Sequence, residues 1–436
     1  MPDKTMTQLT FGAPGYVDAS LSDSAHGLIG SEILKIAAEI RAMVAAGKPV
    51  CNLTVGDFNS KQFPIPETLL DEIHKALDAG ETNYPPSDGV LALRQAAADF
   101  AARELGVRYP LESVLVASGA RPLLYAAYRC VVNPGDIVVY PAPSWNNNHY
   151  VGLTKALGVN LPTHAEDGFQ PTLPQIAPHL DGARMIVINT PLNPSGTVMG
   201  TENLRQIAQA IVDENVKRDK AGRRHLFLLF DQVYGSLVFG TRRHDHPAAL
   251  VPEAAPWIIT VDGISKALAA TGLRVGWLLA APDLTARMRD LIGHIGAWAP
   301  RAEQVATAKF LQNEAAVESF RKRMNAAVRD RLDALHEGFQ ALKADGLPVD
   351  CIDPQGAIYL SLRLDIVGRT LDGEVLEGNE EIRRAILEQA GLAAVPFQAF
   401  ALDEESGWFR LSVGAVSQDE IAQMFPRLRA MLERVR

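Results

Sequence analysis

Short apolar runs alternate with amphipathic stretches of helical period between about residues 90 and 280. The strand-like runs cover residues 113–117, 136–140, 184–189 and 226–230, and helical spacing marks residues 91–105, 123–132 and 201–213. Two further apolar runs lie within residues 257–279. This alternation predicts a largely parallel sheet covered by helices. In such a sheet the ligand crevice lies outside the carboxyl ends of the strands.

Helical period also marks residues 31–48 and 66–79, with an apolar run at 50–55 between them, whereas the charged stretch after residue 213 predicts surface up to Arg224. A helical region at 302–344 precedes strand-like runs at 357–362 and 408–413, and Ser417 with Glu420 forms a possible capping box for the last helix. We therefore expect an α/β fold with a large domain of residues 61–314. A smaller α+β domain follows at residues 315–436, and the N-terminal segment 1–60 contributes to it.

Four residues follow predicted strand ends: Ser118, Trp145, Asn193 and Asp231. Because the carboxyl ends of parallel strands meet at one edge of a sheet, we expect these residues to lie together. The turn at Gly119 and the helix after it present free N–H groups that suit a phosphate. Each residue also has an ordinary structural explanation, such as a turn, a core tryptophan or a capping side chain.

Lys266 lies in a segment of small and apolar residues between two apolar runs. Partial burial would lower the pKa of this amine and prepare it for attack on a carbonyl carbon, as in a Schiff base. Arg274 lies eight residues further on and is able to hold a phosphate through two parallel hydrogen bonds. An aldehyde-reactive amine beside a phosphate clamp points to pyridoxal phosphate. The alternative is a buried strand followed by a loop whose lysine reaches water.

Gly56, Tyr84 and Arg410 complete the candidates. Gly56 follows an apolar run, where the chain can pass close to a ligand or can simply pack in the core. Tyr84 precedes two prolines in a rigid loop. Arg410 lies in an apolar strand, so either a structural acid or a ligand carboxylate should meet it.

Composition narrows the range of functions. The 436 residues are 47% apolar, and the net charge of −9 with scattered basic clusters argues against binding to nucleic acid. The cysteines Cys51, Cys130 and Cys351 are too few and too dispersed for a disulfide framework or a zinc site, so we expect a cytoplasmic protein without a bound metal. The N-terminus lacks an apolar signal-peptide core, and no apolar run is long enough to predict a membrane span.

Taken together, these residues resemble the fold-type I, class I/II aminotransferases that use pyridoxal 5′-phosphate, a family that includes aspartate aminotransferase. The resemblance covers nearly the whole chain. It is carried by Tyr84, Gly89, Gly119, Trp145, Asn189, Pro191, Asn193, Pro194, Gly196, Asp231, Tyr234, Ser265, Lys266, Gly272, Arg274, Gly276 and Arg410.

The resemblance implies a role for each of these positions. Lys266 is implied to bind the cofactor aldehyde and move the substrate proton, and Asp231 to keep the ring nitrogen protonated. Asn193 and Tyr234 would hydrogen-bond the ring oxygen, and Trp145 would stack on the ring. The phosphate would be held by Arg274, Ser118, Ser265, Gly119, Ala120 and Arg121, with Tyr84 from the other subunit of a homodimer. The substrate would meet Arg410, Gly56, Asn193 and Trp145.

Three departures from the family pattern stand out. Gly263 replaces the Ser or Thr that many relatives place three residues before the lysine, and the role of Arg121 in the phosphate turn stays open. Phe397 stands where a Pro-Gly pair is usual and is expected near the substrate entrance. Arg301 is a candidate for binding a second substrate carboxylate, although surface exposure is the commoner explanation.

The leading prediction is amino-group transfer between an L-amino acid and a 2-oxo acid by a ping-pong route. The alternatives are a β-eliminating lyase or a decarboxylase on the same fold, and a non-catalytic binding module. The joint presence of Lys266, Asp231 and Arg410 argues against the binding module, because binding alone does not require a reactive amine.

Overall fold

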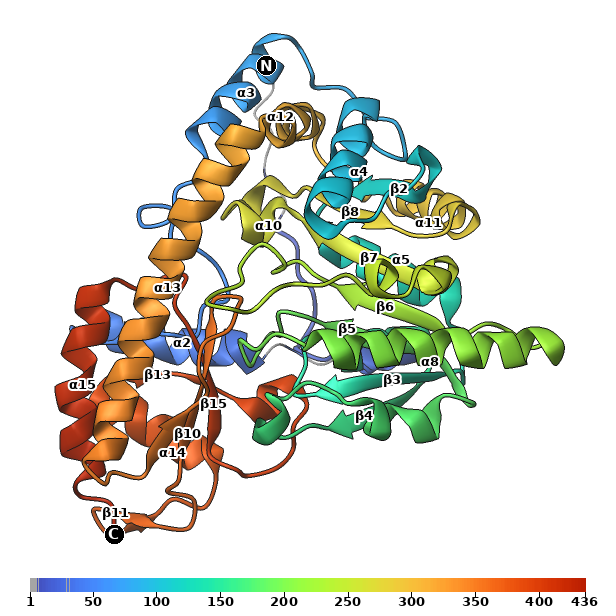
Figure 1. Ribbon diagram of the computed structural model, residues 1–436. Helices are drawn as coiled ribbons and strands as arrows, with labels where there is room; N and C mark the ends of the chain where they lie inside the picture. The colour runs from blue at the N-terminus through green and yellow to red at the C-terminus, as the bar shows by residue number, and fades with distance from the viewer. Residues whose placement is uncertain (1–5, 7, 29, 31) are drawn as a thin grey trace.

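A seven-stranded sheet forms the centre of the larger part of the protein (Figure 1). The computed structural model describes residues 6, 8–28, 30 and 32–436. The strand order is β2 (Val114–Ala117), β8 (Gly276–Leu279), β7 (Ile258–Gly263), β6 (Phe227–Asp231), β5 (Ala183–Asn189), β3 (Ile137–Ala142) and β4 (Leu157–Pro162). All are parallel except β8, which is antiparallel to both neighbours. The predicted α/β class with a mostly parallel sheet is confirmed.

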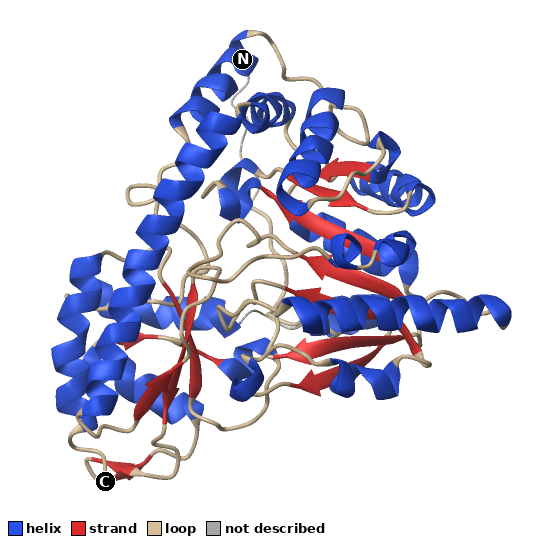
Figure 2. Cartoon of the chain, viewed as in Figure 1, coloured by secondary structure: helices blue, strands red, loops and turns tan. Residues whose placement is uncertain are grey.

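Helices cover both faces of this sheet, as the layers in Figure 2 show. Leu115 and Ala117 pack with α5 (Ala120–Val131) and α11 (Pro282–Ile295) on one face. Val114 and Val116 pack on the other face, with α4 (Leu91–Leu105) and α8 (Thr201–Lys220). Because both faces are buried, the strands read as continuous apolar runs in the sequence.

The C-terminal part contains an antiparallel sheet in the order β14 (Val395–Pro396), β15 (Trp408–Ser412), β10 (Tyr359–Leu364) and β9 (Val349–Cys351). Around it lie α13 (Glu314–Ala344), α14 (Asn379–Ala385) and α15 (Gln418–Leu432). Figure 1 shows α13 running from α12 (Arg301–Gln312) down beside α15. The capping box of Ser417 and Glu420 at the start of α15 is confirmed.

The N-terminal segment joins this C-terminal part. Ile36 and Ile40 of α2 (Glu32–Ala45) share an apolar cluster with Val395 and Phe397. The short strand β1 (Cys51–Asn52) pairs in parallel with β13 (Leu392–Ala393). The division of the chain at residues 60 and 314 stays a prediction.

The remaining elements are short, apart from α3 (Glu67–Asp78) and α6 (Asn147–Thr154). They are α1 (Asp23–His26), α7 (Leu173–Ile176), α9 (Pro247–Leu250), α10 (Ile264–Ala267), β11 (Thr370–Leu371) and β12 (Glu374–Val375). No helix within the described residues is long and apolar enough to cross a membrane.

Three predicted boundaries differ from the structure. α5 begins at Ala120 rather than at residue 123, so Arg121 lies in its first turn. The run at residues 50–55 forms only a two-residue strand, and the helical region at 302–344 is broken at Asn313. The Asn313 side chain accepts a hydrogen bond from the backbone of Ala316 at 3.1 Å, which caps the second helix.

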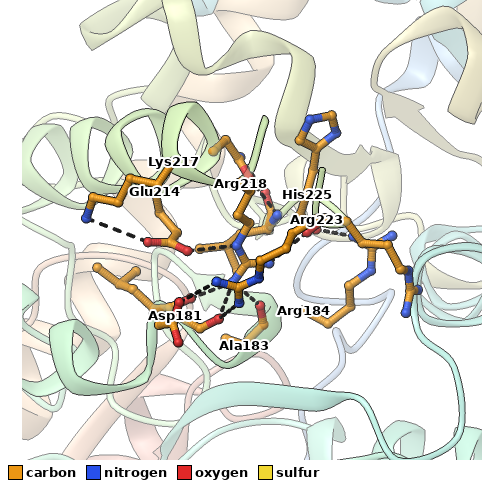
Figure 3. Close-up of polar contacts among 12 residues, drawn as sticks. Asp181, Ala183, Arg184, Glu214, Lys217, Arg218, Arg223 and His225 are labelled. Atoms are coloured by element: carbon orange, nitrogen blue, oxygen red, sulfur yellow. Dashed lines mark hydrogen bonds and ion pairs between the residues drawn. The ribbon is translucent and has the colours of Figure 1, made fainter. Parts of the chain in front are cut away.

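The charged stretch after residue 213 is exposed at Val216, Lys217 and residues 219–224, as predicted, but Glu214, Asn215 and Arg218 within it are buried. Helix α8 continues to Lys220, and Arg218 is buried beside Glu214 in an ion pair of 2.9 Å (Figure 3). The Arg218 guanidinium also donates to the carbonyls of Leu180, Asp181 and Ala183, which lie just before or in β5. A single arginine thus satisfies several backbone oxygens where α8 meets the start of the sheet.

Candidate active site

The carboxyl ends of the strands open into a cavity of about 620 Å³. It brings together most of the sequence-predicted site residues: Gly56, Ala120, Arg121, Trp145, Asn193, Asp231, Tyr234, Ser265, Lys266, Arg274 and Arg410. These residues come from segments far apart in the chain, as expected for the edge of a parallel sheet.

Lys266 lies in α10, directly after β7 ends at Gly263. Its Nζ donates a 2.5 Å hydrogen bond to the carbonyl of Gly56. The same nitrogen lies 5.8 Å from the ring centroids of Phe58 and Tyr234. The amine is therefore held at the cavity wall between two aromatic faces.

Burial lowers the pKa of Lys266 from 10.5 to about 8. The negative charge of Asp57 opposes this shift, while the positive charges of Arg410, Arg121 and Arg274 add to it. The lowered pKa increases the fraction of unprotonated amine near neutral pH, which is the form that attacks a carbonyl carbon.

Asp231 ends β6 and faces the cavity. Its Oδ1 accepts a hydrogen bond from the backbone of Val233 at 3.1 Å. Burial raises the pKa of this carboxyl to about 6, and the bond from Val233 opposes that shift. Among the described residues no cation forms an ion pair with Asp231, so its charge is left for a ligand.

The Asn189 side chain shapes the loop after β5. It donates to the carbonyl of Asp231 at 3.0 Å and accepts from the backbone of Asn193 at 2.9 Å. Tyr234, on the loop after Asp231, shares a hydrogen bond of 2.6 Å between hydroxyl groups with Tyr359 of β10. Burial raises the pKa of Tyr234 well above 10, so this phenol stays protonated.

Arg410 of β15 is 1% exposed and lines the same cavity. Its guanidinium donates to the carbonyl of Thr54 at 2.6 Å and to Oδ1 of Asn193 at 3.2 Å, and it lies 4.8 Å from the ring centroid of Tyr359. Its Nε has no hydrogen-bond partner in the part of the chain that the structure describes. The sequence predicts that Arg410 meets either a structural acid or a ligand carboxylate. Among the described residues no acid pairs with Arg410, which leaves the ligand carboxylate.

Arg274 reaches the turn between β2 and α5. Its guanidinium donates to the carbonyls of Thr271 at 2.8 Å and Ser118 at 2.9 Å. Gly119, at φ 83°, allows this approach, because a Cβ there would lie 2.5 Å from Arg274 Nη2. Ser118 and Gly119 do not line the cavity themselves, whereas Ala120 and Arg121 do.

The absence of a side chain at Gly263 has a steric cause. A Cβ there would lie 2.8 Å from both the Cα of Gly276 and the carbonyl oxygen of Val275. A Cβ at Gly276 would lie 2.6 Å from the carbonyl carbon of Gly119. Strand β8 thus packs its backbone directly against β7 and the β2–α5 turn, which leaves no room for a hydroxyl-bearing residue at position 263.

Trp145 and Arg121 lie at another wall of the cavity. The Arg121 guanidinium is 5.9 Å from the centroid of the Trp145 ring, and Phe400 packs against the same ring at 6.1 Å between centroids. Among the described residues Arg121 makes no ion pair, so its charge faces the cavity.

Three residues singled out from the sequence lie elsewhere. Tyr84 is 82% exposed and packs edge-on against Trp298 at 5.2 Å. Arg301 pairs with Glu81 and does not line the cavity. Phe397 is fully buried, packs against Phe169 at 5.1 Å and does not line the cavity, so its nearness to the substrate entrance stays a prediction.

Sequence reasoning missed Asp57, Tyr150, Thr271 and Tyr359, all of which line the cavity. Asp57 Oδ1 accepts from the hydroxyl of Thr271 at 2.6 Å. A carboxylate directly after Gly56 was the available signal for Asp57. Tyr359 gave none, because its place beside Tyr234 depends on how two distant segments pack.

Comparison with known proteins places this geometry in a class. The model of the family "Aminotransferase class I and II" matches residues 48–428. Aspartate aminotransferase of Rhizobium meliloti (strain 1021) is 31% identical over 409 residues, covering 93% of this chain and 94% of the relative. A probable aspartate/prephenate aminotransferase of Aquifex aeolicus is 27% identical over 407 residues, covering 93% and 96%.

Solved structures agree. The crystal structure of the aspartate aminotransferase from Rhizobium meliloti matches with a TM-score of 0.87 and 28% identity over 95% of this chain and 99% of that chain. The aspartate aminotransferase of Thermus thermophilus, solved with maleate, matches with a TM-score of 0.83 and 26% identity over 94% and 99%.

The fold and the cavity therefore define an enzyme that transfers an amino group between an amino acid and a 2-oxo acid. The chain belongs to the class I and II aminotransferases. The predicted transaminase activity is confirmed at the level of the family, and a lyase or decarboxylase is not favoured.

Proposed function

We propose that this aminotransferase works with pyridoxal 5′-phosphate bound in the 620 Å³ cavity, and that its amino-acid substrate carries a second carboxylate. The observation that carries the proposal is the presence in one cavity of Lys266, an amine of lowered pKa, and Arg410, a buried cation without an acid partner among the described residues. An amine and a carboxylate-binding cation are the two groups needed to handle an amino acid bound to an aldehyde cofactor.

The residues present fit the phosphate end of this cofactor. Arg274 is held beside the first turn of α5, whose N-terminal N–H groups are not capped by a side chain. A helix start and a guanidinium together suit a phosphate group. We assign phosphate binding to Arg274, Ser118, Gly119, Ala120 and Ser265.

The ring end fits as well. Asp231 is a carboxylate with a single hydrogen bond and without a cation partner among the described residues, so a protonated ring nitrogen would complete its surroundings. Trp145 supplies a flat aromatic face at the cavity wall. Asn193 and Tyr234 supply polar groups for the ring oxygen.

When bound, pyridoxal phosphate supplies the aldehyde that carries the amino group and the ring that accepts electrons. Lys266 would hold the cofactor and, once released, move the proton from the substrate α-carbon to the C4′ carbon of the cofactor. Asp231 would keep a proton on the ring nitrogen, because its negative charge stabilises the protonated ring. Arg410 would orient the substrate by gripping its α-carboxylate, with Gly56 close beside it.

The second carboxylate has a clear candidate partner. Four cations of the described residues line the cavity, and Lys266, Arg274 and Arg410 already have roles, which leaves Arg121. The names of the relatives, aspartate aminotransferases with one solved with maleate, support a dicarboxylic substrate such as aspartate. We propose that Arg121, rather than Arg301, binds the distal carboxylate.

We further propose a homodimer located in the cytoplasm. Tyr84 packs edge-on against Trp298 and is otherwise exposed. This exposure suits a residue that reaches the phosphate site of a second subunit. The cysteines Cys51, Cys130 and Cys351 are all unpaired, which suits a reducing compartment.

A half-reaction screen tests the proposal. Protein loaded with pyridoxal phosphate is mixed with each of the twenty amino acids in turn, and its visible absorbance and the 2-oxo acid product are followed. We expect aspartate or glutamate to convert the bound pyridoxal phosphate stoichiometrically to pyridoxamine phosphate. Amino acids without a second carboxylate should do so more slowly. Release of ammonia or carbon dioxide instead would contradict amino-group transfer.

A further inference from the structure

A buried hydrogen-bond network lies next to the cavity. It connects the segment after Asp231 with the segment before Lys266. Gln232 follows Asp231 directly, and Asp262 lies four residues before Lys266. Gln232 is 1% exposed and Asp262 is 8% exposed. Neither lines the active-site cavity, and both line a separate cavity of about 270 Å³.

The Gln232 side chain is the centre of this network. Its amide nitrogen donates to Asp262 Oδ2 at 2.9 Å, and the other carboxylate oxygen accepts from the backbone of Gly263 at 2.7 Å. The Gln232 backbone also donates to the carbonyl of Val261 at 3.0 Å. The loop after β6 is thus tied to the end of β7 by both side chain and backbone.

His244 completes the network. Because the amide nitrogen of Gln232 donates to a carboxylate, its oxygen must accept from His244 Nε2, 3.2 Å away. Burial lowers the pKa of His244 to about 4, so the ring is neutral and carries its proton on Nε2. The ring stacks on Phe230 of β6 at 5.8 Å, with 20° between planes.

The placement of the network relates to the active site. Asp262 accepts the backbone N–H of Gly263, the residue at which β7 turns into α10, and this turn sets where Lys266 points. Gln232 in turn holds the loop that carries Asp231 and Tyr234. Burial raises the pKa of Asp262 to about 7, and the hydrogen bonds from Gln232 and from the backbone of Gly263 oppose that shift. Loss of the Gln232 amide would leave the Gly263 N–H as the only donor to Asp262 among the described residues, which weakens the tie between the loop after β6 and the turn.

We propose that Gln232 and Asp262 are positioning residues that fix the Lys266 amine relative to the Asp231 carboxylate. This inference rests on the catalytic roles proposed for Lys266 and Asp231. Gln232 and Asp262 do not line the cavity proposed for substrate and cofactor. They act through the two loops that they join, in the way that an outer layer of hydrogen bonds orients reacting groups.

The test compares Gln232→Leu with Asn215→Leu. Asn215 is a fully buried amide that both donates to and accepts from the backbone of Leu226, next to the opposite end of β6. The control therefore also loses two buried hydrogen bonds, but far from the turn at Gly263. If Gln232→Leu does not fold, Asp262→Asn, which keeps the shape of the side chain, takes its place.

The main readout needs no cofactor. In purified protein without pyridoxal phosphate, the pKa of Lys266 is obtained from the pH dependence of its acetylation, followed by mass spectrometry. We expect Gln232→Leu to raise this pKa from about 8 toward 10.5, because a displaced amine is better hydrated, and Asn215→Leu to leave it unchanged.

The second readout is kinetic. In the loaded enzyme we expect Gln232→Leu to lower kcat by about tenfold or more with little change in KM. A Gln232→Leu protein with the parent pKa at Lys266 and a kcat no lower than that of Asn215→Leu would overturn the proposal. The proposed function is tested separately by Lys266→Ala, so its failure and the failure of this inference are distinguishable.

Discussion

Arg410 of the C-terminal sheet donates a 3.2 Å hydrogen bond to the side chain of Asn193, which lies on the loop after β5 of the large sheet. This contact joins residues 217 positions apart, and both residues line the cavity proposed for the cofactor and the substrate carboxylate. The position of the Arg410 guanidinium thus depends on how the C-terminal sheet packs against the large sheet.

Replacement of Arg410 tests this placement. We expect Arg410→Lys to lower kcat/KM for aspartate by about a hundredfold, because a lysine cannot make the two parallel hydrogen bonds of a guanidinium. Arg383→Lys is the matched control, since Arg383 is equally buried but is paired with Glu39 and Glu380. The control should lower the melting temperature and leave KM unchanged. An Arg410→Lys enzyme with the parent kcat/KM would contradict the assignment.

Arg121→Met tests the distal carboxylate. A charge-assisted hydrogen bond is worth about 1.5–3 kcal/mol, so kcat/KM for aspartate should fall by about tenfold to a hundredfold. The value for an amino acid with an apolar side chain should change little. Arg301→Met serves as control and should leave the ratio between the two substrates unchanged. Equal losses for both substrates would show that Arg121 does not recognise the side chain.

The charge of Asp231 should destabilise the protein that lacks cofactor. Because burial raises the pKa of Asp231 from 3.8 to about 6, the folded state holds this proton more tightly than the unfolded state. The contribution of this proton to the free energy of unfolding is fully present below pH 3.8 and is lost as the pH rises through about 6. Without cofactor, Asp231→Asn should therefore melt at a higher temperature than the parent at pH 8, and the difference should shrink toward pH 4.

Thermal melting of Asp136→Asn provides the contrast. Asp136 is paired with Arg224 at 2.9 Å, so its neutral replacement should melt at a lower temperature at pH 8. If Asp231→Asn is also less stable than the parent at pH 8, Asp231 has a stabilising partner and does not await a ligand.

Gly263→Ser tests the steric account of the missing hydroxyl. Its Cβ would meet the backbone of Gly276 and Val275, so we expect a loss of about 1–3 kcal/mol in the free energy of unfolding. Affinity for pyridoxal phosphate should not improve. Gly272→Ser is the control, because a Cβ at Gly272 meets no atom within 4 Å. Tighter cofactor binding in Gly263→Ser would mean that the turn can accept the hydroxyl.

The sequence alone predicts the sheet and the residues at its edge. Asp231 and Lys266 were recognisable because each follows an apolar run, and the register of parallel strands brings such positions together. The packing of one part of the chain on another was not predictable in this way. Asp57 and Tyr359 enter the cavity through such packing, and no local pattern marks them.

The burial of two other residues was not predictable from residue type. Arg218 was expected on the surface because charged residues usually are, but the carbonyls of Leu180, Asp181 and Ala183 solvate its guanidinium inside the protein. The resemblance predicts Phe397 near the substrate entrance but gives no sign that aromatic neighbours enclose it.

The most direct measurement concerns Lys266 itself. Protein saturated with pyridoxal phosphate is reduced with borohydride and digested, and its peptides are weighed by mass spectrometry. We predict one phosphopyridoxyl group, on the peptide that contains Lys266, and neither this adduct nor turnover in Lys266→Ala. A modified lysine elsewhere, or normal transamination by Lys266→Ala, would contradict the assignment of Lys266 as the residue that holds the cofactor.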